Sequence, residues 1–388
     1  MTKLLSCCPV CDGSRTHTFL QREGVPVHQN LALSSRKEAL AVVRGDLVLA
    51  ACTDCGFVFN AAFDDSKLTY GADYDNTQSC SPYFAQYMGD LARHLVTKGG
   101  VRDCQIVEVG CGKGVFLRSL VENTSCGNTG IGFDPSYVGP ESDIGGRLRF
   151  ERRFYDSDCA GTPADVVICR HVIEHVSRPL ELLRAVRRAL QDAKSPRIYF
   201  ETPCVEWILR NQVIWDFFYE HCSLFTAASL RTAFERTGFV VHSVSHVFGG
   251  QYLWLEAGLA DASDASLDAG EIPALAQRYA AEEARLRDMW WARIVNLREA
   301  GPVAVWGAGA KGTTFAHLVD PQCKLIDCLV DLNPNKQGKF VPGTGHPIID
   351  IHGLSERGVC TAILMNPNYR EENERLLAAA GIAVQLIE

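Results

Sequence analysis

Short runs of apolar residues alternate with amphipathic stretches over the middle of the chain. We expect strands at residues 105–109, 131–134, 165–169, 197–201 and 239–244. Helices are expected from Gly114 onward and over residues 179–190. Strands that alternate with helices in this way indicate a doubly wound α/β domain, whose parallel sheet continues to about residue 258.

Different patterns precede this domain. Four apolar side chains recur at helical spacing, namely Phe84, Tyr87, Leu91 and Leu95. They predict an amphipathic helix, ending near Lys98, that leads into the domain. Residues 1–66 carry cysteine pairs near both ends, with Pro, Gly, Asn and Ser between them. We expect this segment to be an irregular, metal-stapled module.

The pattern changes again after residue 258. Residues 259–296 are rich in Ala, Glu, Asp and Arg, have no Pro after Pro273, and predict one long helix linking two domains. A second α/β unit follows, because a strand at 302–306 runs into a Gly-rich turn and a helix begins near Thr313. The chain is therefore divided into four parts, 1–66, 67–258, 259–296 and 297–388.

Composition narrows the class of protein. The 388 residues suggest two or three domains, and 47% apolar with 22% charged residues is the balance of a globular protein. The net charge of -8 argues against a nucleic-acid partner, because binding to phosphates requires clustered Lys and Arg. No apolar run is long enough to span a bilayer, and the N-terminus lacks a secretory signal. We expect a cytoplasmic protein without a membrane partner.

Two cysteine pairs are candidate metal ligands. Cys8-Pro-Val-Cys11 and Cys52-Thr-Asp-Cys55 each have the Cys-x2-Cys spacing. Four thiolates can complete a tetrahedral zinc site, and neither pair contains a ligand that would leave a position for water. We therefore expect structural zinc at Cys8, Cys11, Cys52 and Cys55, the alternative being four unrelated reduced cysteines.

A glycine-rich turn follows the first strand of the central domain. Its sequence is Glu108-Val-Gly-Cys-Gly-Lys-Gly114, and glycines let a ligand lie against bare backbone. Such a turn alone also occurs in dinucleotide and phosphate sites. Glu108 lies two residues before the first glycine, and Asp134 ends the following strand. With these two acids the segment resembles class I S-adenosylmethionine-dependent methyltransferases.

That resemblance implies the residues that hold S-adenosylmethionine. The turn passes the amino-acid part of the cofactor, Asp134 accepts hydrogen bonds from the ribose hydroxyls, and the segment after the third strand lines the far side. The expected cofactor-binding residues are Glu108, Gly110, Cys111, Gly112, Gly114, Asp134, Arg170 and His171.

With the cysteine pairs, the central turn and the C-terminal segments 303–312, 330–338 and 340–348, the whole chain resembles the three-domain sugar C-methyltransferase family. The resemblance implies an N-terminal zinc-binding domain, a class I methyltransferase domain with a Rossmann-like parallel sheet, and a C-terminal Rossmann-like α/β domain. In that family the C-terminal domain helps to hold a nucleotide-linked deoxysugar. Backbone amides and cations for a diphosphate are expected at Gly307, Gly309, Lys311 and Lys336. The alternative is a C-terminal domain that only supports the fold.

The same resemblance indicates acid and base groups. The segment around Tyr219-Glu220-His221 resembles the family's Tyr-His-Glu-His stretch, in which the last His acts as a base or helps to polarise the substrate, and Glu220 and His221 match it by position. The chain departs from the family at Phe218, which replaces Tyr, at Tyr219, which replaces His, and in the polar residues after Tyr74. The catalytic candidates are His221, Glu220, Tyr219, His175 and Tyr74. Core packing or capping is the alternative for His221, and a polar helix start for His171 and His175.

Three functions remain open at this level. The first is C-methylation of a nucleotide-linked keto-sugar or related metabolite, in which a base deprotonates carbon beside a ketone and the enolate attacks the cofactor methyl group. The second is O- or N-methylation of a small natural product. The third is a non-catalytic scaffold that binds S-adenosylmethionine, against which the intact glycine turn and Asp134 argue.

Overall fold

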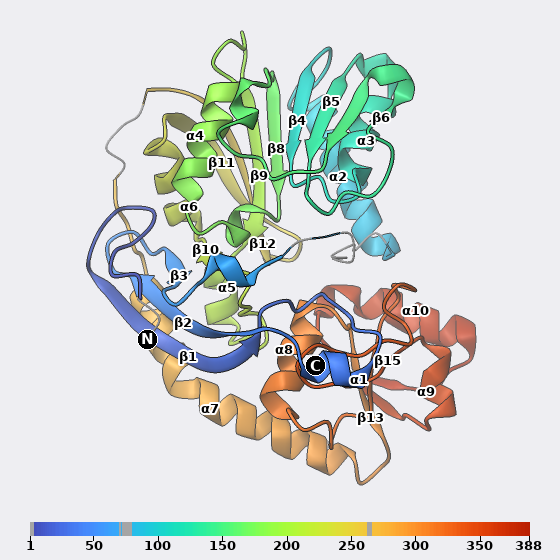
Figure 1. Ribbon diagram of the computed structural model, residues 1–388. Coiled ribbons are helices and arrows are strands. Elements are labelled where there is room, and N and C mark those ends of the chain that lie inside the picture. Colours follow the sequence, from blue (N-terminus) through green and yellow to red (C-terminus); the bar gives the residue numbers. More distant parts are fainter. Residues whose placement is uncertain (1–3, 70, 72–79, 262–265) are drawn as a thin grey trace.

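The computed structural model describes residues 4–69, 71, 80–261 and 266–388, except for the side chain of Ala160. These residues form three sheets, of eight, five and four strands. The eight-stranded sheet lies in the upper lobe of Figure 1 and the five-stranded sheet in the lower lobe. The four-stranded sheet lies at the left, beside both lobes.

The central sheet has the strand order expected of a doubly wound α/β domain. In order across the sheet its strands are β11 (Phe239–Val247), β12 (Tyr252–Leu259), β9 (Arg197–Pro203), β8 (Val166–Arg170), β4 (Gln105–Val109), β5 (Thr129–Phe133), β7 (Leu148–Glu151) and β6 (Ser142–Asp143). The run from β9 to β7 is parallel. β12 is antiparallel to both β9 and β11. Its pairing with β11 is a hairpin, because only four residues connect the two strands.

Five helices belong to this sheet and its loops: α2 (Pro82–Thr97), α3 (Val115–Glu122), α4 (Pro179–Ala189), α5 (Val205–Arg210) and α6 (Ala227–Glu235). The predicted entry helix is α2. Ser81 caps it by accepting a hydrogen bond from the Phe84 amide, and Pro82 occupies its first turn. Its buried side chains Phe84, Leu91 and Leu95 are among the four that predicted it.

The N-terminal segment is a sheet, and the expectation of an irregular module is wrong. Its strands are β1 (Thr16–Pro26), β2 (Arg44–Cys52), β3 (Val58–Asn60) and β10 (Ser223–Leu224), with the short helix α1 (Arg36–Leu40) before β2. β1 and β2 form an antiparallel ribbon. Only Cys222 separates His221 from β10, so the pairing of β10 with β3 ties the segment that carries His221 to the N-terminal sheet.

The C-terminal sheet is parallel throughout. Its strands in order are β15 (Ile348–Ile349), β14 (Cys328–Val330), β13 (Val303–Trp306), β16 (Thr361–Leu364) and β17 (Gln385–Ile387). Its helices are α8 (Ala310–Val319), α9 (His352–Glu356) and α10 (Arg370–Ala380). With β13 in the middle, this is the Rossmann-like arrangement expected from the sequence.

The linking helix α7 (Ile272–Leu297) is shorter than predicted. Residue 259 belongs to β12, and Gly270 has a φ of +50° just before the helix begins. Pro273 lies in the first turn of α7, where its missing amide costs no helical hydrogen bond. α7 runs along β1 toward the C-terminal sheet (Figure 1).

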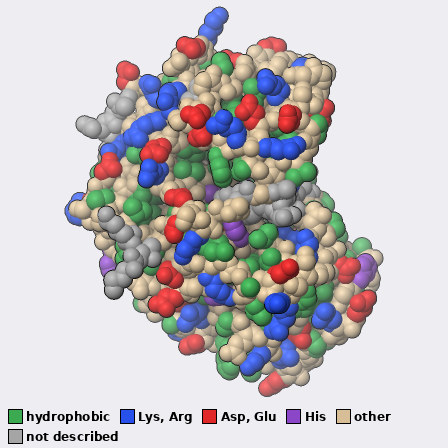
Figure 2. All heavy atoms as spheres, in the orientation of Figure 1, with side chains coloured by type: hydrophobic (Ala, Val, Ile, Leu, Met, Phe, Trp, Pro, Cys, Tyr) green, Lys and Arg blue, Asp and Glu red, His purple; other side chains and the backbone are tan. Residues whose placement is uncertain are grey.

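Acidic and basic side chains are interspersed on the face shown in Figure 2, which displays no broad area of one sign. No helix in the described part of the chain combines the length and apolar character needed to cross a bilayer.

Candidate functional site

The glycine-rich turn connects β4 to α3 at the carboxyl edge of the central sheet. Gly110 has a φ of +69°, and a Cβ there would lie 2.1 Å from Cγ2 of Val172. A Cβ on Gly112 would meet no atom within 4 Å. The turn therefore requires glycine at position 110 for the fold, whereas Gly112 presents bare backbone to open space.

Glu108 lies at the base of this turn and is almost fully buried. Its Oε2 accepts a hydrogen bond from the Leu117 amide in the first turn of α3, at 3.2 Å. Burial raises the pKa of Glu108 to about 8, against a smaller opposing effect of Arg170.

Asp134 follows β5 and holds two loops together. Its Oδ2 accepts a hydrogen bond from the Gly112 amide at 2.8 Å, and its Oδ1 accepts from the amide and hydroxyl of Ser136 at 2.7 and 2.6 Å. The carboxylate is partly exposed beside the glycine turn. It can accept further hydrogen bonds from a ligand in that space.

A cavity of about 470 Å³ opens over the turn, within the size range of small-molecule sites. Seven of the eight predicted cofactor residues line it: Glu108, Gly110, Cys111, Gly112, Asp134, Arg170 and His171. Gly114 does not line it and instead caps α3 with a φ of +75°. Phe84 and Met88 of α2 contribute apolar walls.

Arg170 ends β8 on one wall of this cavity. Its Nε donates a 2.6 Å hydrogen bond to Oε2 of Glu201, and its guanidinium lies over the ring of Phe116. Tyr87 also donates its hydroxyl proton to Glu201. Nη2 of Arg170 is buried without a hydrogen-bond partner, so one donor remains for a ligand.

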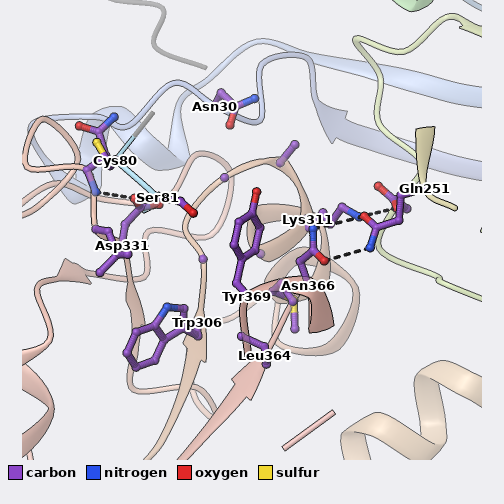
Figure 3. A pocket seen from close by; sticks show the side chains of 18 of the residues that line it. Asn30, Cys80, Ser81, Gln251, Trp306, Lys311, Asp331, Leu364, Asn366 and Tyr369 are labelled. Carbon is purple, nitrogen blue, oxygen red and sulfur yellow. Dashed lines mark hydrogen bonds and ion pairs between the residues drawn. The ribbon is translucent and has the colours of Figure 1, made fainter. Parts of the chain in front are cut away.

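A second cavity, of about 260 Å³, opens between the central and C-terminal sheets. All four predicted substrate residues line it: Gly307, Gly309, Lys311 and Lys336. Figure 3 shows Lys311 directed toward Gln251, and Nζ of Lys311 donates hydrogen bonds to Gln251 and Asp216 at 3.1 and 2.7 Å. Lys336 is buried, with Nζ 4.0 Å from Oδ2 of Asp331.

Sequence reasoning missed two residues of this second site. Gly307, Gly309 and Gly312 have the Gly-x-Gly-x-x-Gly spacing, and Asp331 follows the next strand. A Cβ on Gly312 would lie 1.8 Å from the Gly307 carbonyl oxygen, so α8 can approach the turn only with glycine there. Asp331 accepts a 2.9 Å hydrogen bond from the Ala308 amide. The spacing and the acid together were the signal for a nucleotide-binding turn.

The two cavities meet at a histidine cluster. His171 lines both, His175 lines the first and His221 lines the second. The rings of His175 and His221 are 4.8 Å apart, and buried Glu174 lies beside them. Burial, with a smaller effect of His175, lowers the pKa of His221 to about 3. Burial raises the pKa of Glu174, but the three imidazoles together have a larger opposite effect and lower this pKa to about 2.

Two catalytic candidates lie away from both cavities. Tyr219 is fully buried, and its hydroxyl accepts a hydrogen bond from the Asp64 amide at 3.0 Å. Glu220 accepts a 2.7 Å hydrogen bond from the Gln29 amide. Both side chains point into the N-terminal sheet region, so we assign neither of them contact with a substrate. Tyr74 lies outside the described residues.

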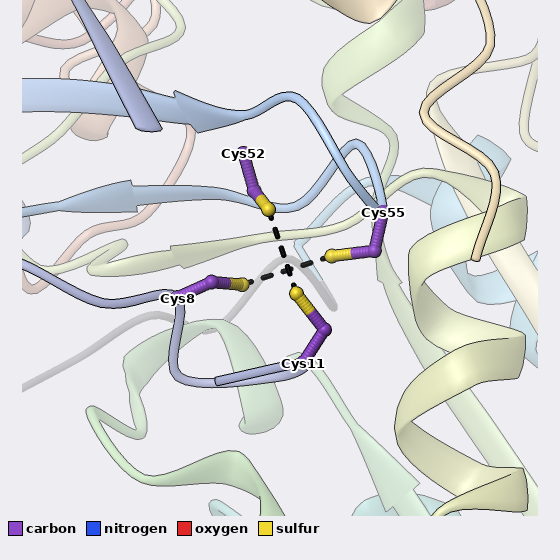
Figure 4. A group of neighbouring side chains, drawn as sticks. All are labelled: Cys8, Cys11, Cys52 and Cys55. Atoms are coloured by element: carbon purple, nitrogen blue, oxygen red, sulfur yellow. Dashed lines mark hydrogen bonds between the residues drawn. The ribbon is translucent and has the colours of Figure 1, made fainter. Parts of the chain in front are cut away.

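The four predicted cysteine ligands converge (Figure 4). Sγ of Cys8 lies 3.7 Å from Sγ of Cys55, and Sγ of Cys11 lies 3.5 Å from Sγ of Cys52. Four sulfurs at about 2.3 Å from a tetrahedral zinc ion are separated by about 3.8 Å. The spacing of the thiols therefore fits a four-coordinate metal site.

Comparison with known families matches two segments of the chain. Residues 80–244 match the methyltransferase domain family, and residues 265–381 match the C-methyltransferase C-terminal domain family. The first match contains the glycine turn and the second contains the Gly307 turn.

Curated relatives match only part of the central domain. The ubiquinone biosynthesis O-methyltransferase of Yersinia enterocolitica is 27% identical over 126 residues, which is 31% of this chain and 49% of the relative. A protein of the same name from Yersinia pestis is 25% identical over the same shares. The chain thus spans about half the length of the curated relatives it matches.

Solved structures show distant likeness. The 1,6-didemethyltoxoflavin-N1-methyltransferase of Burkholderia thailandensis is 15% identical, with a TM-score of 0.36 over 48% of this chain and 82% of that chain. The magnesium protoporphyrin IX methyltransferase of Synechocystis is 16% identical, with a TM-score of 0.35 over 48% of this chain and 88% of that chain.

Proposed function

Because the chain is an S-adenosylmethionine-dependent methyltransferase with the architecture of the three-domain C-methyltransferases, we propose that it C-methylates a nucleotide-linked keto-sugar or related metabolite. The observation that carries this proposal is that His171 lines two cavities at once, one over the methyltransferase turn and one over the C-terminal turn. A methyl donor and an acceptor bound in these cavities would meet at the histidine cluster.

The first cavity suits the cofactor. Gly112 offers bare backbone, Asp134 would accept hydrogen bonds from the ribose hydroxyls, and the unpartnered Nη2 of Arg170 would donate a hydrogen bond to the cofactor. Bound S-adenosylmethionine supplies an electrophilic methyl group on its sulfonium. The protein aligns that group with the acceptor and excludes water from it.

The second cavity suits a nucleoside diphosphate. The turn at Gly307 and Gly309 precedes α8, so its amides and the helix dipole favour an anion. Lys311 and Lys336 add positive charge, while Asp331 is positioned like the acid that binds ribose in nucleotide-binding folds. These groups would hold the nucleotide and direct the sugar toward His171.

His221 is our candidate base. Its Nδ1 is buried without a hydrogen-bond partner, and the side chain lines the acceptor cavity. A ring nitrogen of His221 removes the proton from carbon beside the acceptor ketone, and that carbon then forms the new bond to the methyl group. The sulfur–methyl bond breaks in the same step.

We also propose that Cys8, Cys11, Cys52 and Cys55 bind one structural zinc ion. The converging thiols support this assignment. Bound zinc would crosslink the ends of the β1–β2 ribbon, which lie next to these cysteines.

O-methylation of a small molecule is the second candidate. The curated relatives of the central domain are O-methyltransferases, and His221 can equally accept a hydroxyl proton. The C-terminal cavity favours the first candidate because it provides a separate anion site.

The release of S-adenosylhomocysteine tests whether the acceptor must carry a nucleotide. We would compare nucleotide-linked keto-sugars with the same sugars lacking the nucleotide. Release only from the nucleotide-linked compounds is expected. Equal release from both would contradict a nucleotide-binding role for the second cavity.

A further inference from the structure

From the side chains at the junction of the two cavities we infer a second metal site: Glu174, His175 and His221 bind a divalent transition-metal or zinc cation. One donor atom from each residue lies within 4.8 Å of the other two. Two imidazoles with one carboxylate are a common ligand set for such cations, with coordination positions left for substrate or water. This site is separate from the four-cysteine site.

Two nitrogen or oxygen atoms of these side chains are buried and lack a hydrogen-bond partner. Glu174 is 1% exposed, and its Oε1 accepts no hydrogen bond, although Nδ1 of His171 lies 3.5 Å from it. Nδ1 of His221 is likewise buried without a hydrogen-bond partner. A buried carboxylate oxygen and a buried imidazole nitrogen are costly to leave without a hydrogen bond. A cation between them would satisfy both.

The surrounding structure orients these donors from two directions. Glu174 and His175 lie on the turn η5 (Ile173–His175) after β8, and the Thr202 hydroxyl donates a 3.1 Å hydrogen bond to Oε2 of Glu174. On the other side, the Cys222 carbonyl next to His221 accepts a 3.0 Å hydrogen bond from the Asn60 amide. The contact from Thr202 orients the Glu174 carboxylate directly, as is typical of metal ligands, and the contact from Asn60 fixes the backbone next to His221.

Only small movements are needed to complete the site. Neighbouring ligands at about 2.1 Å from a cation are separated by about 3 Å. Side-chain rotation can bring donors within 4.8 Å to that spacing, because His175 and His221 are both partly exposed to the cavities.

The position of the cation gives it a role in the proposed reaction. His175 faces the methyl-donor cavity, whereas Glu174 and His221 face the acceptor cavity. A cation there would bind the acceptor oxygen and stabilise the negative charge that develops on it. Cation binding by His221 and proton removal by His221 exclude each other, since both use a ring lone pair. His171, which lines both cavities, would then be the base.

Cation binding can be tested without a substrate. Protein whose cysteine site is filled with zinc is titrated with Mn²⁺ and followed by electron paramagnetic resonance, with Glu174→Gln and His221→Gln as variants. The exposed residue His242 provides the matched control His242→Gln. We expect one Mn²⁺ per wild-type and control chain, and at least tenfold weaker binding in both site variants.

A spectroscopic measurement on wild-type protein makes the test independent of variant folding. Electron spin-echo modulation from ¹⁴N is expected on the bound Mn²⁺, because two ligands are imidazoles. Absence of binding, absence of nitrogen modulation, or equal binding by all variants would overturn the inference. If His221→Gln abolishes turnover while wild-type protein binds no cation, the cation is excluded and the proposed methyl transfer with His221 as base stands.

Discussion

The rings of His175 and His221 lie 4.8 Å apart with their planes at 88°, yet each lines a different cavity. His175 comes from the turn after β8, and His221 comes from the segment that β10 ties to the N-terminal sheet. Their proximity therefore depends on the N-terminal and central parts of the chain folding together.

Replacing Asp134 tests the cofactor site. Asp134→Ala should weaken S-adenosylmethionine binding by about 1.5 to 3 kcal/mol, as expected for a lost hydrogen bond to a charged group. Isothermal titration calorimetry measures this change, and Asp158→Ala at an exposed position is the control. Unchanged affinity would contradict the proposal that Asp134 binds the ribose hydroxyls of the cofactor.

Replacing His221 tests the acceptor side of the junction. His221→Ala should retain S-adenosylmethionine affinity because His221 does not line the cofactor cavity in the described structure. Turnover should fall by about 10²- to 10⁴-fold, as for loss of a positioned acid–base group. The release of S-adenosylhomocysteine measures the rate, with His242→Ala as the control. Wild-type turnover in His221→Ala would show that other groups carry out the acid–base step.

Lysine substitution tests the second cavity. Lys311→Ala should weaken binding of a nucleoside diphosphate at least tenfold, because Lys311 is one of the two lysines that line this cavity. The exposed residue Lys98 provides the control Lys98→Ala. Calorimetry with the free nucleoside diphosphate gives both affinities. Equal affinities would favour a C-terminal domain that only supports the fold.

Zinc binding is tested on the cysteine site. Elemental analysis should find at least about one zinc ion per chain in wild-type protein, and Cys52→Ser should lose that ion and unfold at a lower temperature. Cys360→Ser, at an exposed cysteine, should behave like wild type. Wild-type zinc content in Cys52→Ser would contradict the four-thiolate site.

A buried pair in the C-terminal domain gives a pH prediction. Burial lowers the pKa of His346, but the 3.0 Å contact with Asp320 raises it overall above the ordinary 6.5. Protonated His346 therefore stabilises the folded state below pH 6.5, and this contribution is lost as pH rises through the higher folded pKa.

Thermal unfolding of wild type and His346→Gln should show this loss. The difference in melting temperature should shrink as the pH rises above about 6.5. Hydrogen exchange at the Lys324 and Ile326 amides, which donate to Asp320, gives a local measurement. A difference that grows with pH would contradict the assigned direction.

Local patterns predicted the sites that are local in sequence. The turn from Glu108 to Gly114 and each Cys-x2-Cys pair consist of residues a few positions apart, so their spacing could be recognised in the sequence, although the cofactor prediction also needed Asp134. The β1–β2 ribbon depends on pairing between distant residues, and its turn-rich ends concealed it. The start of α7 was misplaced because the Ala- and Asp-rich residues before Ile272 have a helical composition without a helical start signal.

Side-chain direction could not be obtained from the sequence. Tyr219, Glu220 and His221 are adjacent, yet only His221 lines a cavity, because the first two pack against the N-terminal segment. Likewise, the contact between Glu174 and His221 joins elements that meet only in the folded chain. Asp331 could have been predicted from the sequence, since its spacing from the Gly307 turn follows a known nucleotide-binding pattern.

The bond formed by the transferred methyl group tests the central proposal most directly. The protein would be incubated with S-[methyl-¹³C]adenosylmethionine and nucleotide-linked keto-sugars, and the product examined by NMR. We predict that the labelled carbon is bonded to a sugar carbon beside the ketone. A label bonded to oxygen or nitrogen, or no transfer to any nucleotide-linked acceptor, would contradict C-methylation of this substrate class.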